Sequence, residues 1–201
     1  AYSSRVGAGP FLTEQLNEAG DKIRELGHEY GTTTKRPRRC GWLDLVAIKY
    51  SVMINGITGI AINHMDTIGK FDTIKLCVAY NHKGKITTDF STNPDYLNNC
   101  EAVYEEFDGD FGDLSGCKTR DELPVNAQKY LKRIEEVLEV PIKFVGTGAG
   151  REDLIVWRND VFMNKTKRKI FETSMSLFAK KGYEATSIEE ITSVVGVAKG
   201  T

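Results

Sequence analysis

The sequence predicts an α/β domain followed by a small all-α piece. Segments with helical spacing of apolar residues alternate with short β-branched runs along most of the chain. The charge balance then changes near residue 163: residues 163–201 carry seven Lys and Arg against four Asp and Glu, whereas residues 1–162 carry 20 against 24. We therefore predict two domains, 1–162 and 163–201.

Three segments of the first domain are predicted to be helices. Leu12–Leu26 has apolar residues at intervals of three or four, and Leu43–Met53 is rich in apolar residues. The third helix begins at Pro124, which suits a first turn, and runs to about Leu138. Its predicted buried face consists of Ala127, Tyr130, Leu131, Ile134 and Leu138.

Short runs rich in β-branched and aromatic residues are predicted to be strands. A turn at Asn81–Gly84 separates two of them, and a glycine-rich turn separates the last two. The expected strands are Ile57–Asn63, Ile74–Tyr80, Lys85–Phe90, Ile142–Val145 and Leu154–Trp157.

Composition excludes several classes of protein. The chain has 201 residues, 40% hydrophobic and 27% charged, with a net charge of −1, so its bulk is not built to hold nucleic acid or an anionic membrane. It contains neither an apolar run of roughly 18 residues nor a signal peptide, and we expect a cytoplasmic protein. The four cysteines are far apart and the three histidines do not join them, so we predict reduced thiols and no metal site.

The most informative stretch of the chain is a basic loop, Gly31–Arg39. It combines three threonines with four cations, and its glycine and proline argue against a continuous helix. Hydroxyl groups and guanidinium forks suit phosphate or carboxylate ligands. A solvated basic loop without a ligand is the alternative interpretation.

Several motifs of the first domain resemble those of adenylosuccinate synthetase. The resemblance covers about residues 1–162, corresponds to the C-terminal part of that nucleotide-binding α/β enzyme, and implies GTP-dependent ligation of IMP and aspartate in purine biosynthesis. It also implies Mg²⁺ and a homodimer. The motifs are residues 1–11, the basic loop, Cys40–Asp44, Leu76–Tyr80, Val103–Glu106, Asp113–Gly116 and Tyr130–Glu135.

The resemblance implies roles for the residues of the basic loop. Arg36 is expected to contact IMP, and Arg38 is the expected catalytic cation near the aspartate carboxylates and the phosphoryl group of GTP. Lys35 stands where the family usually has glycine, which closes such a loop more easily. The whole expected substrate loop is Thr32, Thr33, Thr34, Lys35, Arg36, Pro37 and Arg38.

Three further segments are implied to bind nucleotides. Val6 is expected to contact the IMP ribose through its backbone. Asp66 is expected to accept two N–H donors from guanine, because adenine lacks them. The remaining expected GTP-binding residues are His64, Met65, Gly146, Thr147 and Gly148. Plain turns or helix caps are the alternative interpretation of all three segments.

Parts of that enzyme are missing from the sequence. There is no Gly-x-x-x-x-Gly-Lys phosphate loop, and neither the catalytic Asp and His of the family nor its Mg²⁺ site is matched. Because the chain begins at Ala1 and ends at Thr201, we expect a piece cut from longer sequences. We predict that it does not catalyse the ligation alone.

Residues 163–201 resemble the N-terminus of a tetracycline-repressor (TetR) family regulator. A helix starting near Met163 is expected to end at Gly182, and Thr186–Glu189 is a capping-box signature for a second helix. Val194–Gly196 then forms a helix-turn-helix style turn. A DNA-binding regulator fragment is therefore the alternative function. Sequence-specific DNA binding is not expected, because the motif breaks off inside the recognition helix. We interpret the chain as a fusion of the two pieces.

Overall fold

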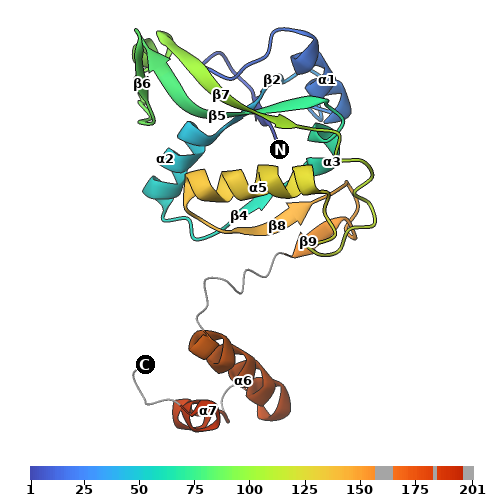
Figure 1. Cartoon of the computed structure of the whole chain (residues 1–201), viewed down its shortest axis with the longest axis vertical. Helices are drawn as coiled ribbons and strands as arrows, with labels where there is room; N and C mark the ends of the chain where they lie inside the picture. The colour runs from blue at the N-terminus through green and yellow to red at the C-terminus, as the bar shows by residue number, and fades with distance from the viewer. Residues whose placement is uncertain (157–164, 183–184, 197–201) are drawn as a thin grey trace. The chain divides into compact units, whose positions relative to one another are not determined.

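The computed structural model describes residues 1–156, 165–182 and 185–196. The chain divides into two compact units, Ala1–Trp157 and Arg158–Thr201 (Figure 1). The predicted domain boundary after residue 162 lies outside the described residues and stays a prediction.

The first unit contains three small sheets, which confirms the mixed α/β class. In the two-stranded sheet, β1 (Ser3–Arg5) pairs antiparallel with β2 (Arg39–Gly41). In the next, β5 (Thr73–His82) pairs with β3 (Leu43–Asp44), β6 (Lys85–Thr87) and β7 (Cys100–Asp108). In the third, β8 (Ile142–Gly146) lies between β4 (Ile60–Ile62), which is parallel to it, and β9 (Leu154–Val156).

Five helices accompany these strands within residues 1–156. Two of them, α3 and α4, are single turns, and α3 directly follows β4 (Figure 1). The helices are α1 (Glu18–Leu26), α2 (Leu45–Asn55), α3 (Met65–Ile68), α4 (Pro94–Leu97) and α5 (Val125–Leu138).

Helix α5 forms the centre of the hydrophobic core, and its predicted bounds and buried face are both confirmed. All five residues predicted to be buried are at most 2% exposed. The ring of Tyr130 meets Phe107 of β7 edge-on, with centroids 5.8 Å apart. Arg133 adds two hydrogen bonds of 2.7 Å to Glu105 on the same strand.

The predicted start of the first helix was wrong by about six residues. Helix α1 begins at Glu18 because the side chain of Asn17 accepts hydrogen bonds from two amides of the first turn. The residues before it pair instead with β2 and with Trp42, which directly follows β2. The Gln15 amide donates to the Cys40 carbonyl, and the Trp42 amide donates to the Thr13 carbonyl. Long-range pairing thus overrides the helical spacing of this segment.

The second predicted helix also begins later than expected. Leu43 and Asp44 form β3, which pairs in parallel with β5. The Asp44 carboxylate then caps α2 by accepting from two amides, and the helix continues to Asn55. A left-handed Gly56, with φ of +59°, ends it.

The predicted strands differ from the observed ones mainly in length. The predicted strand at residues 74–80 lies within β5, and the turn shortens to Lys83 and Gly84, both at positive φ. The strands predicted at 57–63 and 85–90 each reduce to three residues. Trp157 lies outside the described residues. Strand β7 was not predicted, since its acidic residues break the apolar pattern.

The second unit contains α6 (Lys165–Lys181) and α7 (Ile188–Val195). Gly182 and Gly196 follow the two helices at positive φ, as their predicted stop and turn roles require. The cap of α7 is Ser187 rather than Thr186, whose hydroxyl donates to the Gly182 carbonyl. Met163 and residues 197–201 lie outside the described residues.

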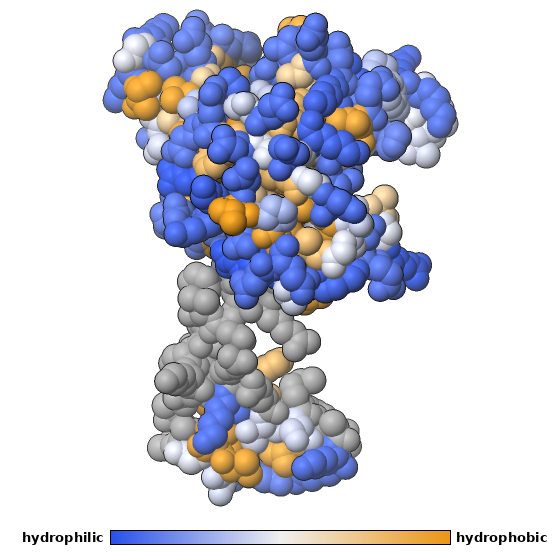
Figure 2. Space-filling view, turned by 45° about the vertical axis from the view of Figure 1, so that its right-hand side comes forward, coloured by the Kyte–Doolittle hydropathy of each residue, from blue (hydrophilic) through white to orange (hydrophobic). Residues whose placement is uncertain are grey.

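The surface is mixed in character. Figure 2 shows a mainly hydrophilic face with separate hydrophobic spots. No helix in the described part of the chain combines the length and the apolar character that crossing a membrane requires.

The core role of α5 generates a stability prediction. Leu131→Ala removes a fully buried side chain and is expected to lower the free energy of unfolding by roughly 2–5 kcal/mol. Val125→Ala, at a residue 65% exposed on the same helix, is the matched control and should change it by less than about 0.5 kcal/mol. Urea unfolding followed by circular dichroism measures both. Equal losses would contradict the assigned core.

Candidate functional site

The basic loop connects α1 to β2 and has the form of a short hairpin. The Gly31 amide donates to the Arg36 carbonyl at 2.9 Å, the Lys35 amide donates to the Gly31 carbonyl at 2.8 Å, and Tyr30 pairs with Pro37. The side chains at the tip of the loop are exposed: Thr32, Thr33, Thr34, Lys35, Arg36 and Pro37. The loop therefore presents its hydroxyls and cations to solvent, where an anionic ligand can reach them.

Lys35 occupies the one strained backbone position of the loop's described residues. Its φ is +54°, in the left-handed region that favours glycine. A residue with a side chain is disfavoured there by roughly 1 kcal/mol. The resemblance implies that the family usually has glycine here, and the positive φ of Lys35 gives a physical reason for that preference.

Arg38 is fixed at the base of the loop by a buried carboxylate. Its Nη1 donates to Glu29 at 2.9 Å, and the other oxygen of Glu29 accepts from the Tyr2 hydroxyl at 2.7 Å. Burial by itself raises the pKa of Glu29, but the donors Tyr2 and Arg38 outweigh it, so the net pKa is below its ordinary value. Glu29 is thus an ionised anchor that is only 5% exposed.

The Val6 segment lies beside the base of this loop. Arg5, the last residue of β1, lies opposite Arg39, the first residue of β2. The Arg39 guanidinium donates to the carbonyls of Gly7 and Gly9, at 2.8 and 2.7 Å, and so holds the segment in place. Val6 itself is 75% exposed. The antiparallel pair therefore brings together two of the predicted ligand-binding segments.

Strands β4 and β8 bring the other two predicted segments together. The strands are parallel, so residues 63–66 and 146–148 leave the sheet at the same edge. A Cβ on Gly146 would lie only 2.8 Å from the side-chain oxygen of Asn63. This close approach shows that the two segments are neighbours.

The residues of the first of these segments differ in what they can offer a ligand. His64 is exposed with φ of +60°, and its ring centroid lies 5.1 Å from that of Tyr2. Asp66 lies in the first turn of α3 and is partly exposed. The Met65 side chain is completely buried in the core, so only its backbone is available.

The second segment is a turn organised by Asp153. The Thr147 amide and hydroxyl both donate to the Asp153 carbonyl, at 2.8 and 3.1 Å, and Thr147 is 3% exposed. The Asp153 carboxylate accepts from the Gly150 amide, and a Cβ on Gly148 would lie 2.5 Å from it. Asp153 was not predicted as a site residue, because its contacts depend on how the turn closes.

Tyr2 connects the two halves of the site. Its hydroxyl donates to Glu29 beneath the basic loop, while its ring contacts His64 at the end of β4. Tyr2 and Glu29 were not predicted as site residues. Tyr2 lies in one of the recognised motifs, and Glu29 shortly precedes the loop, but neither carries a signal of its own in the sequence.

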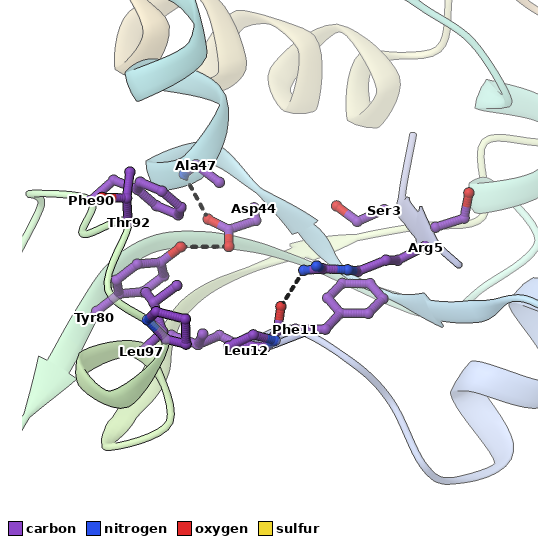
Figure 3. Close-up of a pocket in the computed structure, with 13 residues that line it drawn as sticks. Ser3, Arg5, Phe11, Leu12, Asp44, Ala47, Tyr80, Phe90, Thr92 and Leu97 are labelled. Carbon is purple, nitrogen blue, oxygen red and sulfur yellow. Dashed lines mark hydrogen bonds between the residues drawn. The ribbon is translucent and has the colours of Figure 1, made fainter. Parts of the chain in front are cut away.

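A separate cavity of about 560 Å³ adjoins β1 and the start of α2 (Figure 3). Asp44 accepts from the Tyr80 hydroxyl at 2.6 Å and from the Ala47 amide, and Arg5 donates to the Pro10 carbonyl. Burial raises the pKa of Asp44. The Asp44 carboxylate, the Tyr80 hydroxyl and the Arg5 guanidinium each make a hydrogen bond within the protein.

Comparison with known proteins matches this architecture to one enzyme family. A family model described as adenylosuccinate synthetase covers residues 1–155. The chain belongs to the adenylosuccinate synthetase family. Curated synthetases from Acetivibrio thermocellus and Meyerozyma guilliermondii are 63% and 51% identical to it, over 156 and 155 residues. A fully ligated adenylosuccinate synthetase from Plasmodium falciparum superposes with a TM-score of 0.73 at 45% identity.

The chain spans little more than a third of these synthetases. The match covers 78% of the chain and 37% of the Acetivibrio thermocellus protein, and 77% of the chain and 36% of the Meyerozyma guilliermondii protein. For the Plasmodium falciparum structure the shares are 77% and 38%. Residues 170–201 match a second family, described as bacterial regulatory proteins of the tetR family. The two predicted resemblances are therefore both confirmed.

The strained Lys35 generates a prediction about the synthetase loop. Lys35→Gly relieves the left-handed backbone and is expected to raise the free energy of unfolding by about 0.5–1 kcal/mol. Lys35→Ala is the matched control: it also removes the charge but keeps the strain, so it should give no gain. Chemical denaturation of the parent chain and of the two variants measures the three free energies of unfolding. A gain in the alanine variant as large as that in the glycine variant would contradict the backbone explanation.

The Glu29 anchor generates a pH prediction. Tyr2→Phe removes one donor, so the pKa of Glu29 is expected to rise, as measured by carbon NMR titration. Because the folded-state pKa of Glu29 lies below its ordinary value of 4.5, its stabilising contribution is present above that pH and disappears as the pH falls through the folded pKa. The variant should therefore unfold in acid at a higher pH.

The control for that experiment is Tyr30→Phe. Tyr30 donates to the carboxylate of Glu25, and it is not among the groups that shift the pKa of Glu29. This variant should leave the titration of Glu29 and the acid unfolding midpoint unchanged. An unshifted Glu29 in the Tyr2 variant would show that the Tyr2 hydroxyl does not stabilise the charge.

Proposed function

We propose that residues 1–155 form part of the substrate-binding wall of an adenylosuccinate synthetase. The reaction is the GTP-dependent ligation of IMP and aspartate in purine nucleotide biosynthesis. The observation that carries the proposal is the parallel pairing of β4 with β8, which sets residues 63–66 beside residues 146–148. A nucleotide site at the carboxyl ends of parallel strands is a general property of α/β folds.

In this proposal the guanine of GTP binds between those two segments. The Asp66 carboxylate accepts two N–H groups from the guanine edge, which adenine cannot supply. The exposed His64 ring, placed beside Tyr2, offers a face on which the base stacks. Residues 146–148 approach the nucleotide through their backbone, which the close-packed glycines permit.

IMP and aspartate bind at the other end, around the basic loop. Val6 and Arg36 contact IMP, and the threonines of residues 32–34 donate to the aspartate carboxylates. Arg38 lies near those carboxylates and the transferred phosphoryl group of GTP, where negative charge spreads over oxygens. The observed bond to Glu29 uses one of the five N–H donors of Arg38 and orients its guanidinium.

The described residues do not fit the Mg²⁺ that this family uses. Within residues 1–156, 165–182 and 185–196, no three His, Cys, Asp or Glu side chains are grouped so that they could hold a metal ion. We therefore assign no step of the reaction to Mg²⁺. The phosphate cradle, the general base and the metal ligands are proposed to come from synthetase residues outside the matched region.

Isothermal calorimetry with GTP, and with ATP for comparison, tests the nucleotide site. We expect the folded chain to bind GTP more tightly than ATP. Asp66→Ala should weaken GTP binding by about 10- to 100-fold, the effect of removing a charged hydrogen-bond acceptor. Asp108→Ala, at an exposed residue that ends β7, is the matched control and should bind GTP like the parent chain.

Two outcomes would contradict the proposal. Equal affinity for GTP and ATP would exclude guanine recognition by Asp66. Absence of heat with either nucleotide, from a chain that circular dichroism shows to be folded, would mean that these segments do not form a nucleotide site on their own.

A DNA-binding role is the second candidate, and the match of residues 170–201 to the tetR family favours it. Among the described residues of this unit, Ile191 and Val195 of α7 are buried and Lys169 donates to the Val195 carbonyl. These contacts pack α7, the helix before the predicted helix-turn-helix turn, against α6. We propose weak, sequence-independent contact with phosphates as the most this unit supplies.

A further inference from the structure

The guanidinium of Arg39, the first residue of β2, binds two partners at once. Its Nε and Nη2 donate to the two carboxylate oxygens of Glu14, at 2.9 and 2.5 Å, and its Nη1 donates to the carbonyls of Gly7 and Gly9, at 2.8 and 2.7 Å. These contacts engage four of the five N–H donors of an arginine. A lysine ammonium, which is a point charge on a flexible stem, cannot reproduce this planar arrangement.

The ion pair with Glu14 fixes the direction of that guanidinium. The two side chains are 15% and 29% exposed, and Glu14 itself pairs with Gly41 of β2 in an isolated bridge. The hydrogen bond from Arg39 is the main cause that holds the pKa of Glu14 below its ordinary value, and the carboxylate in turn raises the pKa of Arg39. The pair is therefore charged at neutral pH and is attached to the strand from which Arg39 extends.

Val6 lies between two fixed points of the backbone. Before it, Arg5 pairs with Arg39 in the antiparallel ladder, and after it, the Gly7 carbonyl is held by the Arg39 guanidinium. The Val6 side chain is 75% exposed, so packing in the core does not hold it. The direction of its backbone therefore depends on these two anchors, and Arg39 contributes to both.

The arrangement places two like charges opposite each other. Arg5 and Arg39 are cross-strand partners, and like charges in that position destabilise a sheet. Arg5 donates to the Pro10 carbonyl at 2.5 Å, the bond drawn from its guanidinium in Figure 3. Both guanidiniums thus bind carbonyls of residues 7–10. They hold the shape of an exposed segment at a cost to the two-stranded sheet, which favours a role in preorganising that segment for a ligand.

We propose that Arg39 is a positioning residue for nucleotide binding. By holding the carbonyls of Gly7 and Gly9 it fixes the backbone of Val6 in the direction that contacts the ribose of IMP, and Glu14 fixes Arg39 in turn. The inference rests on the proposed function, in which Val6 contacts IMP. It adds a basis for specificity: Arg39 supports a preference for nucleoside monophosphates that carry ribose hydroxyls.

The test compares the affinity of the full chain for IMP with that for its dideoxy analogue, which lacks both ribose hydroxyls. In calorimetry the parent chain should bind IMP about 3- to 10-fold more tightly, the effect of one neutral hydrogen bond. Arg39→Lys keeps the charge but not the four hydrogen bonds, so it should abolish this preference and leave the affinity for the analogue unchanged. A general loss of structure would instead lower both affinities together.

Arg133→Lys is the matched control. Arg133 also makes a two-bond ion pair, with both bonds to Glu105 of β7 at 2.7 Å, so the substitution has the same chemical effect on a different pair. This variant should keep the preference for IMP. Glu14→Gln and Glu105→Gln form a second matched pair, in which only the change at Glu14 should weaken the preference. Circular dichroism confirms that each variant is folded before binding is measured.

A measurement without ligand tests the positioning step by itself. NMR relaxation of the backbone amides should give order parameters of about 0.85 for residues 7–9 of the parent chain, the value of a rigid backbone. In Arg39→Lys they should fall below about 0.6, the range of a flexible backbone. In Arg133→Lys they should remain at the parent value.

The other outcomes overturn the inference. Order parameters that stay high in Arg39→Lys would show that Arg39 does not position residues 7–9. A preference for IMP that this variant retains, or an equal loss of both affinities, would show that Arg39 has no role in recognising the ribose. If the parent chain binds neither ligand while Arg39 still orders the segment, the proposed contact between Val6 and IMP is wrong and the inference fails with it, although the positioning step holds.

Discussion

The buried carboxylate of Glu29 is the interaction on which the arrangement of the candidate site depends. An ionised group that is 5% exposed needs hydrogen-bond donors, and Tyr2 from the start of the chain and Arg38 from the basic loop are two of those that Glu29 has. These bonds join the residue before β1, the segment after α1 and the residue before β2. The ring of Tyr2 extends the connection to His64 and therefore to the edge where β4 and β8 end.

The two halves of the candidate site are built on different strand geometries. An antiparallel pair, β1 and β2, sets the Val6 segment beside the basic loop, and a parallel pair, β4 and β8, sets the two segments that we propose for nucleotide binding side by side. In each half the exposed groups belong to loops, whereas the strands that position them are held by the core around α5. This separation of a rigid support from accessible loops is what a binding surface requires.

We propose this surface as one wall of a larger active site. The basic loop presents Arg36 to solvent, where an anionic ligand can reach it. The chain spans about 37% of the Acetivibrio thermocellus synthetase, and the proposal assigns the phosphate cradle and the metal ligands to the part of the enzyme outside the match.

The sequence by itself determined the α/β class, the bounds and buried face of α5, most of β5, the exposed basic loop and the two family resemblances. These follow from local spacing and from recognisable motifs. Only the tertiary structure decided where α1 begins, that β7 exists, and that Tyr2, Glu29 and Asp153 support the site. The physical reason is distance along the chain: Tyr2 meets Glu29 across 27 residues, and residues 13–15 pair with the β2 segment rather than joining the helix. Such pairings compete with local preference and leave no periodic trace in the sequence.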